Sequence, residues 1–372
     1  MRAAGGPGTA LKRGPRPADT SIVLKLNRKN NQSVVGLDLD PSHIAAAEVS
    51  VNGHIAIKRG AVAELRPGIL RDGEVTDAPA LTEALKTFFA ENELPKNVRL
   101  GVANQRIVVR SLDLPPLEDP KQLDAAVRAE APDHIPMPMD EAILDYVPLG
   151  LVQSVGGPRM RVVIVAARRE LIDRLVSATK DAGLKVEGID LAAFGMVRAL
   201  ASKEEDSGAV LYINVAGLTN VAVANSTGCL FTRAAAGGLS AIVATLAERR
   251  SLTLEHARMW LGHVGLVTPL ASVEGDAELV AATRATLDEG VHQLADTVRN
   301  SLNFYRMQDN AETVSRALLT GPAVTIPGFA DKLAELLNLP VEIAVAATDE
   351  ALTDEVDPGR LTVAAGLAVE DR

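Results

Sequence analysis

The hydrophobic pattern of the chain predicts the same group of strands in both halves. In the first half, residues 33–40 (SVVGLDLD) and 44–51 (IAAAEVSV) are apolar runs separated by a short polar turn, and a third run follows at 54–65. In the second half, residues 208–238 again contain three apolar runs with two polar turns between them. Short apolar runs bounded by turn residues are typical of strands. We therefore predict that a three-stranded meander is built twice.

Apolar residues recurring at three- and four-residue steps predict helices between and after these strands. Asp119 and Pro120 are typical of a helix start, and Pro132 is expected to end the same helix. The last helix is expected to pack back on the first half of the chain. Helices are predicted at 79–90, 119–132, 169–183, 240–250, 254–262, 276–307, 328–338 and 361–370, and further strands at 98–103, 142–152, 159–168 and 316–321.

Changes in composition along the chain divide it into two lobes and a small insertion. Residues 1–32 are rich in glycine, proline and basic residues. They are expected to form a disordered tail or, alternatively, an electrostatic tether to an anionic membrane or an acidic partner. The expected division of the rest is 33–104 and 183–207 for the first lobe, 105–182 for an inserted α+β subdomain, 208–355 for the second lobe and 356–372 for a closing helix.

Composition and charge exclude several classes of protein. Hydrophobic residues make up 47% of the 372 residues and aromatic residues only 3%, so aliphatic side chains must form the core. The single cysteine, Cys229, excludes a disulfide framework and a cysteine-based metal cluster, and it favours the cytoplasm. No apolar run approaches the length of a membrane-spanning helix. The net charge of −10 argues against nucleic acid as the main ligand.

Two lobes that face each other would form a cleft, with the first turn of each meander at its edge. If the backbone amides of both turns point into the cleft, they can hold the phosphates of a nucleotide from two sides. Four segments, 34–49, 111–150, 211–223 and 318–338, are similar to the actin-like ATPase superfamily. Within it the chain resembles the PilM family of type IV pilus assembly proteins, relatives of the cell-division protein FtsA. The resemblance implies an α/β fold of two actin-like lobes, a duplicated ribonuclease H-like unit, with an inserted α+β subdomain.

The resemblance also implies a site for ATP with Mg²⁺ in the cleft. Asp38 is expected near the metal ion or, alternatively, as a solvated acid at the end of a strand. Gly237 and Gly238 are expected either to contact phosphate or to form a strand-to-helix turn in which Ser240 is the N-cap residue, and the turn is the favoured interpretation. The positions expected to contact nucleotide are Asp38, Asp40, Ser42, Asn214, Ala216, Gly217, Thr219, Gly237, Gly238, Gly321 and Pro322.

The sequence departs from the family pattern at several of these positions. An aspartate at position 40 places negative charge where phosphate oxygens would lie, and a β-carbon at position 216 crowds the approach of the backbone. We therefore predict that ATP binding is weak or absent and that the protein is an adaptor rather than an ATPase. An active ATPase and an FtsA-like filament-forming membrane anchor are the alternatives. The family usually has glycine for Asp40, lysine for Ala45, Asp-Ile-Gly for Asn214-Val215-Ala216, Gly-Gly for Gly321-Pro322, and glutamate and lysine for Arg258 and Leu261.

The partner implied by the resemblance is a PilN-like bitopic membrane protein, whose N-terminal cytoplasmic peptide would bind between the first lobe and the inserted subdomain. The protein is then expected in the cytoplasm at the inner face of the membrane, held there through this partner, and the pilus motor ATPase is a further candidate partner. Asp113 is expected to pair with a basic residue of the peptide. Leu112 and Leu114 are expected on opposite faces of a strand, so that at most one of them faces the groove. These apolar residues could equally form the core of the subdomain. The residues expected to contact the peptide are Leu112, Leu114, Val163 and Val165.

Overall fold

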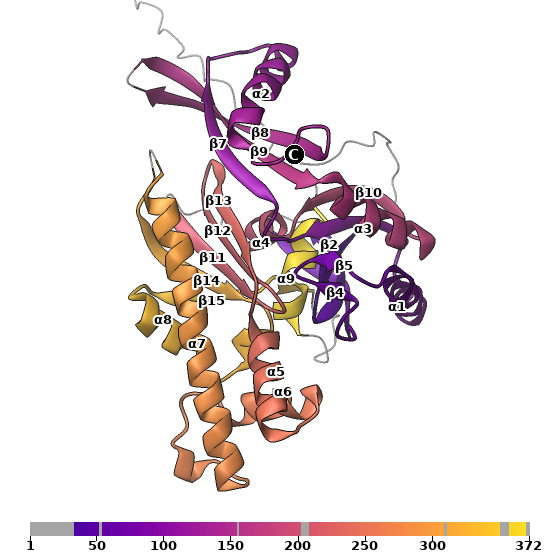
Figure 1. The fold of residues 1–372 in the computed structure, drawn as a ribbon, viewed down its shortest axis with the longest axis vertical. Coiled ribbons are helices and arrows are strands. Elements are labelled where there is room, and N and C mark those ends of the chain that lie inside the picture. Colours follow the sequence, from indigo (N-terminus) through magenta and orange to yellow (C-terminus); the bar gives the residue numbers. More distant parts are fainter. Residues whose placement is uncertain are drawn as a thin grey trace, which may run out of the picture.

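The computed structural model describes residues 33–51, 54–154, 156–201, 208–308, 311–349 and 357–369. The predicted basic tail, residues 1–32, lies outside the described residues. In the described part of the chain, two lobes lie side by side, and a smaller unit sits above them at the top of Figure 1.

Each lobe is built around a sheet of the same design. In both, three antiparallel strands form a meander, and two further strands pair in parallel beyond the first of them. The predicted duplication is therefore present. The first sheet has the order β10 (Lys185–Leu191), β6 (Asn97–Val102), β1 (Val35–Asp40), β2 (His43–Val51), β3 (Ile55–Glu64) and β16 (Ala347–Thr348). The second has the order β13 (Gly228–Ala235), β12 (Thr219–Asn225), β11 (Ala209–Val215), β14 (Val314–Thr320) and β15 (Val341–Ile343).

Helices cover the sheets where the apolar periodicity predicts them. Most begin at a side-chain cap: the carboxylate of Asp276, for example, accepts the backbone N–H of Leu279 at 2.8 Å at the start of the longest helix. The first lobe carries α1 (Ala78–Glu91), α3 (Arg169–Asp181) and the hairpin of β4 (Leu70–Arg71) and β5 (Glu74–Val75). The second lobe carries α5 (Leu239–Arg250), α6 (Leu254–Val264), η1 (Leu270–Ser272), α7 (Ala277–Arg306), η2 (Pro322–Thr325) and α8 (Phe329–Leu337).

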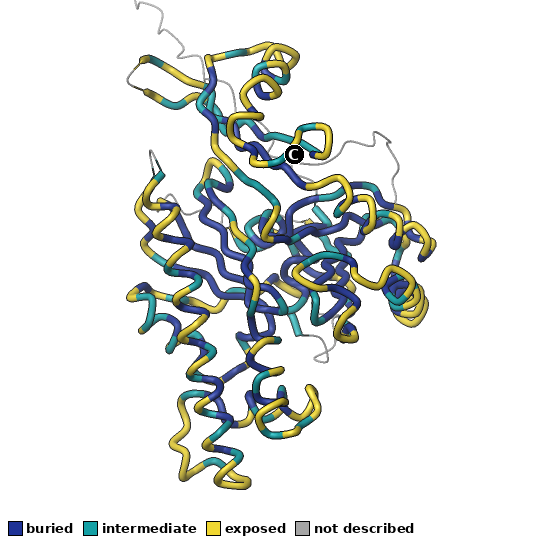
Figure 2. The backbone as a smooth tube through the Cα atoms, in the orientation of Figure 1, coloured by how far each residue is buried: buried dark blue, intermediate teal, exposed yellow. Residues whose placement is uncertain are grey.

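Two helices, α4 (Ala192–Leu200) and α9 (Pro358–Leu367), lie between the lobes and pack against each other (Figure 1). Helix α9 also packs on β1, β2, β3 and β6 of the first sheet, and it shares an apolar cluster with strands of the second. Glycines allow these contacts. A β-carbon at Gly36 would lie 1.8 Å from the carbonyl oxygen of Ala364, and one at Gly366 would lie 1.8 Å from that of Gly195. Buried residues consequently extend through both lobes and the two helices between them (Figure 2).

The smaller unit is a three-stranded antiparallel sheet covered on one face by a helix. Its strands, in the order β7 (Val108–Leu114), β9 (Gly157–Arg168) and β8 (Ala142–Ser154), share an apolar core with α2 (Pro120–His134). Helix α3, predicted within the same insertion, instead places Ile172 and Leu175 in the core of the first lobe. The boundaries given in the sequence analysis stay predictions.

The predicted end of α2 at Pro132 is wrong, because the helix continues to His134. Proline lacks a backbone N–H and so removes one hydrogen bond from the helix. In the last turn that loss is tolerated, since the later bond from the N–H of Ile135 to the carbonyl of Ala131 still forms at 3.0 Å.

Candidate functional site

The first turns of the two meanders meet across the cleft. The Asp40 carboxylate, at the end of β1, accepts the backbone N–H of Gly217 at 2.8 Å and that of Leu218 at 3.1 Å. These two amides belong to the loop between β11 and β12, in the other lobe. The aspartate oxygens thus already occupy the donors of the second loop that were expected to hold phosphate.

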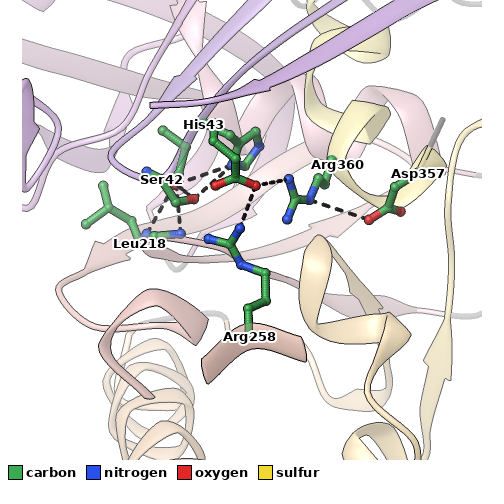
Figure 3. A network of polar contacts seen from close by, with 9 residues as sticks. Ser42, His43, Leu218, Arg258, Asp357 and Arg360 are labelled. Carbon is green, nitrogen blue, oxygen red and sulfur yellow. Dashed lines mark hydrogen bonds and ion pairs between the residues drawn. The ribbon is translucent and has the colours of Figure 1, made fainter. Parts of the chain in front are cut away.

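Local contacts hold Asp40 in this position (Figure 3). Its carboxylate also accepts the backbone N–H of Ser42 at 2.9 Å and the hydroxyl of the same residue. The Ser42 oxygen lies 2.9 Å from Nδ1 of His43, which is buried. Burial lowers the pKa of His43, so its ring is neutral near pH 7. The carboxylate is therefore held by neutral donors.

The second loop is shaped to receive this carboxylate. A β-carbon at Gly217 would lie 2.3 Å from Oδ1 of Asp40, so only glycine permits the contact. Ala216 is buried, and its carbonyl oxygen would lie 2.4 Å from a β-carbon at Gly238. The hydroxyl of Thr219 donates to the carbonyl of Gly237 at 2.8 Å. The two glycines therefore pack against the second loop.

The expected N-cap at Ser240 is wrong. Helix α5 starts at Leu239 with Gly238 as its N-cap residue, and no side chain caps it. Gly238 is extended, with φ of −179°, and directs the chain from the second loop into the helix. The expected serine therefore lies inside the first turn rather than before it.

Three further polar residues are buried near the ends of β1, β11 and β14, namely Asp38, Asn214 and Thr320. Burial and, secondarily, the charge of Asp40 raise the pKa of Asp38 to about 8. Its neighbour across the strand pair is Ala45, which has no charge to stabilise a carboxylate. Among the described residues, no group of three or more histidine, cysteine, aspartate or glutamate side chains could hold a metal ion. Any metal at Asp38 would thus need ligands of other kinds, such as amide or backbone carbonyl oxygens, a nucleotide or water.

The turn at Gly321 and Pro322, which was expected to contact nucleotide, is packed from two sides. Gly321 has a φ of +91°, and a β-carbon there would lie 2.2 Å from the side-chain oxygen of Asn214. The carbonyl oxygen of Gly321 would lie 2.8 Å from a β-carbon at Gly359, in the first turn of α9. Pro322 is buried. This turn is therefore tied to both the second loop and α9.

A second polar contact joins the lobes at Arg258. Its guanidinium lies 2.7 Å from the carboxylate of Glu64, at the end of β3, and that carboxylate also lies 2.6 Å from Arg360 of α9 (Figure 3). Burial alone would raise the pKa of Glu64, but the hydrogen bonds and charges of the two arginines outweigh it and lower that pKa. Leu261, at the second substituted position of α6, lies in the core of the second lobe.

The residues predicted to bind a peptide divide into two pairs. Leu112 and Leu114 are two residues apart on β7, share one face of the strand, and belong to the core beneath α2. The expectation that they lie on opposite faces is therefore wrong, because side chains two residues apart on a strand point the same way, and neither of the two faces a groove. Val163 and Val165 lie on the opposite face of the small sheet, towards the first lobe, and each lines a cavity.

The carboxylate of Asp113 already has a basic partner in this chain. It forms two hydrogen bonds of 2.8 Å with the guanidinium of Arg161, its cross-strand neighbour on β9. These bonds lower the pKa of Asp113. The carboxylate that was expected to pair with the peptide is therefore already paired within the subdomain.

The cavity at Val163 has a volume of about 180 Å³ and lies where the small sheet, α4 and the turn between β12 and β13 meet. No residue of α4 was among those predicted to line this groove. Phe194 and Val197 are three residues apart in an apolar segment, so helical spacing could have identified them. The α4 side and the turn also contribute polar residues, including Arg198 and Asn225. The apolar lining comprises Val147, Leu149, Val163, Phe194, Val197, Ala201 and Cys229. A smaller cavity of about 50 Å³ at Val165 follows between the same sheet and β10.

A family model described as type IV pilus assembly protein PilM matches residues 36–266. The chain belongs to this family. Among solved structures, it is similar to a PilM–PilN type IV pilus biogenesis complex, with 24% identity and a TM-score of 0.74 over 91% of this chain and 98% of that chain.

Solved structures of less similar, actin-like proteins share the fold. MreB5 of Spiroplasma citri bound to ADP is 13% identical, with a TM-score of 0.50 over 90% of this chain and 95% of that chain. The same protein bound to AMPPNP is 12% identical, with a TM-score of 0.51 over 91% and 95%. The predicted two-lobed actin-like fold is confirmed. Within the described ranges, no helix is long and apolar enough to cross a membrane.

Proposed function

We propose that this protein is a cytoplasmic scaffold of the type IV pilus assembly machine that binds the N-terminal peptide of a PilN-like membrane protein at the inner face of the membrane. Membership of the PilM family and the likeness to a PilM–PilN complex support this proposal. The pilus motor ATPase is a further candidate partner on the same grounds.

The observation that carries the proposal is the apolar groove at Val163. The face of the small sheet that does not carry α2 meets α4 there, and Phe194 and Val197 remain partly exposed. A cavity of about 180 Å³ suits individual apolar side chains of an extended segment rather than a folded domain. We assign the groove to the side chains of the peptide.

One strand at this groove can form backbone hydrogen bonds with an added peptide. Strand β9 pairs with β7 on one side and β8 on the other, so its backbone is already hydrogen-bonded. Among the described strands, β8 pairs only with β9, and it contributes Val147 and Leu149 to the groove. An extended peptide would add to the free edge of β8 and direct alternate side chains into the cavity.

The cleft supports a scaffold rather than an ATP-driven machine. Asp40 already binds the amides of the second loop, and Ala45 and Asn214 lack the charges that the family carries at these positions. We propose that the nucleotide site is degenerate and that ATP with Mg²⁺ binds weakly or not at all.

Peptide binding to variants of the groove tests the proposal. A fluorescent peptide of the N-terminal residues of the PilN-like protein from the same genome is titrated with the full chain and its anisotropy recorded. Val197→Asp and Leu149→Asp place a charge in the groove and should each weaken binding at least about tenfold, since burying an unpaired charge costs more than 1.4 kcal/mol. The control is Leu151→Asp, on the same strand but 62% exposed, which should bind as wild type. Wild-type affinity in both groove variants, with unchanged circular dichroism, contradicts the proposal.

A further inference from the structure

Two polar contacts among the described residues join the first lobe directly to the second, in addition to the packing of α4 and α9 between them. One is the carboxylate of Asp40 on the amides of Gly217 and Leu218. The other is the ion pair of Glu64 and Arg258, at 2.7 Å. In each, the first lobe supplies a carboxylate and the second lobe supplies the donor.

The first contact resembles the binding of a phosphate group by backbone amides. Backbone amides of a turn bind anionic oxygens, and here the anionic oxygens belong to the chain itself. Asp40 is only 6% exposed and accepts hydrogen bonds on both oxygens, to both lobes. Hydrogen bonds to an ionised acceptor are about twice as strong as neutral ones. The contact is therefore comparable to that of an external ligand in the same place.

We propose that Asp40 is an internal ligand of the second loop that, together with the Glu64–Arg258 pair, holds the two lobes closed without nucleotide. This inference goes beyond the proposed function, because it concerns the conformation of the cleft and is independent of any partner. Where a nucleotide would join the lobes only while bound, these side chains join them permanently.

The two contacts should differ in strength. Asp40 is buried, whereas Glu64 is 50% exposed and Arg258 is 30% exposed. Exposed ion pairs contribute little because water screens them, although the second arginine, Arg360, reinforces this one. Loss of the Asp40 contact should therefore open the lobes more than loss of the ion pair.

Distances between spin labels on the two lobes test the inference. Labels are attached at Arg71→Cys in β4 and Met259→Cys in α6, both exposed, in a Cys229→Ala background. The parent protein should give one narrow distance distribution without nucleotide, and millimolar Mg-ATP should not move it. A broad distribution in the parent protein, or one that narrows or shifts with Mg-ATP, overturns the inference.

The variants identify the contacts responsible. Asp40→Asn keeps the side-chain shape but turns an amide donor towards the donors of the second loop, so the main distance should lengthen. Arg258→Gln should produce a smaller shift in the same direction. Glu278→Gln breaks an ion pair with Arg250, at 2.8 Å within the second lobe, and should change nothing. Parent-like distances in both cleft variants overturn the inference.

A folding defect in Asp40→Asn leaves the test intact. Circular dichroism identifies such a defect. The distance distribution of the parent protein and its response to Mg-ATP then test the Asp40 contact, and Glu64→Gln, at a half-exposed position outside the core, gives a second test of the ion pair. Parent-like distances in Glu64→Gln and Arg258→Gln together overturn the role of the ion pair in closure.

Discussion

Gly36 of β1 and Ala364 of α9 are in contact through their backbones. A β-carbon at residue 36 would lie 1.8 Å from the carbonyl oxygen of Ala364. Because this oxygen belongs to a helix backbone, it cannot rotate away as a side chain could. The contact fixes how closely the last helix approaches the first sheet.

Gly36→Ala is expected to lower the free energy of unfolding by about 3 kcal/mol or more, since overpacking of a rigid interior costs about 1–3 kcal/mol in ordinary cases. Urea unfolding followed by circular dichroism measures the loss. Gly262→Ala is the control, because no atom lies within 4 Å of a β-carbon at that position of α6. It should be neutral or slightly stabilising. Equal stability of the two variants would show that α9 does not sit against β1 this closely.

Asp38 should make stability depend on pH. Its pKa is about 8 in the folded protein and about 4 in an unfolded chain. Between these values the folded state retains a proton that the unfolded state has lost, so the free energy of unfolding falls as pH rises from about 4 to about 8. Asp38→Asn removes this dependence. The variant should match wild type near pH 4 and become progressively more stable than wild type up to about pH 8.

Unfolding by urea at a series of pH values measures this difference. Asp140→Asn, at an exposed position, is the control and should differ from wild type by a constant amount. A difference between Asp38→Asn and wild type that does not grow with pH contradicts the burial of a protonated Asp38.

Mg-ATP should bind weakly to the wild-type protein, and restoring glycines should strengthen it. Asp40→Gly and Ala216→Gly together free the amides of Gly217 and Leu218 and remove a charge whose repulsion at ~4 Å costs roughly 1–4 kcal/mol. Calorimetric titration should show at least about a tenfold gain in affinity. Asp140→Gly controls for the change in net charge. Micromolar binding of Mg-ATP by the wild-type protein, with steady phosphate release, would contradict a degenerate nucleotide site. No gain in affinity in the double variant would show that the two loops do not lie at the nucleotide site.

Asp113→Asn should leave peptide affinity unchanged, because the carboxylate is already paired with Arg161. The pair is partly exposed, so its loss should cost at most about 1 kcal/mol of stability. Anisotropy titration and a thermal melt of the same sample give both quantities. A loss of peptide affinity as large as that expected for Val197→Asp would contradict this prediction and indicate that Asp113 contacts the peptide.

The sequence predicted local structure well and the partners of particular faces less well. Meander strands and α7 follow from apolar runs and periodicity, which depend only on neighbouring residues. The sequence pattern showed that Leu112 and Val163 are apolar strand residues. It did not show that Leu112 would face α2 and Val163 would face α4, on the opposite side of the small sheet. Which face each helix covers depends on the chain between them, and not on the strands themselves.

The cleft shows the same limit. The sequence indicated that Asp40 would repel phosphate, a property of its charge alone. It did not indicate that Gly217 and Leu218 would donate to this carboxylate, because that contact depends on how two lobes distant in sequence are placed. The missed N-cap at Gly238 has a related cause: the second loop packs against that residue, and this contact sets where α5 begins.

The position of α9 has a consequence for the order in which the protein can fold during synthesis. Strands β1, β2, β3 and β6 are made early, but the helix that packs on them comprises residues 358–367. A ribosome must therefore translate the whole second lobe before the first can complete its core. The second lobe can close its own sheet sooner, since β11 to β15 lie within residues 209–343. The half of the protein that is synthesised first therefore completes its packing only after the other half has been made.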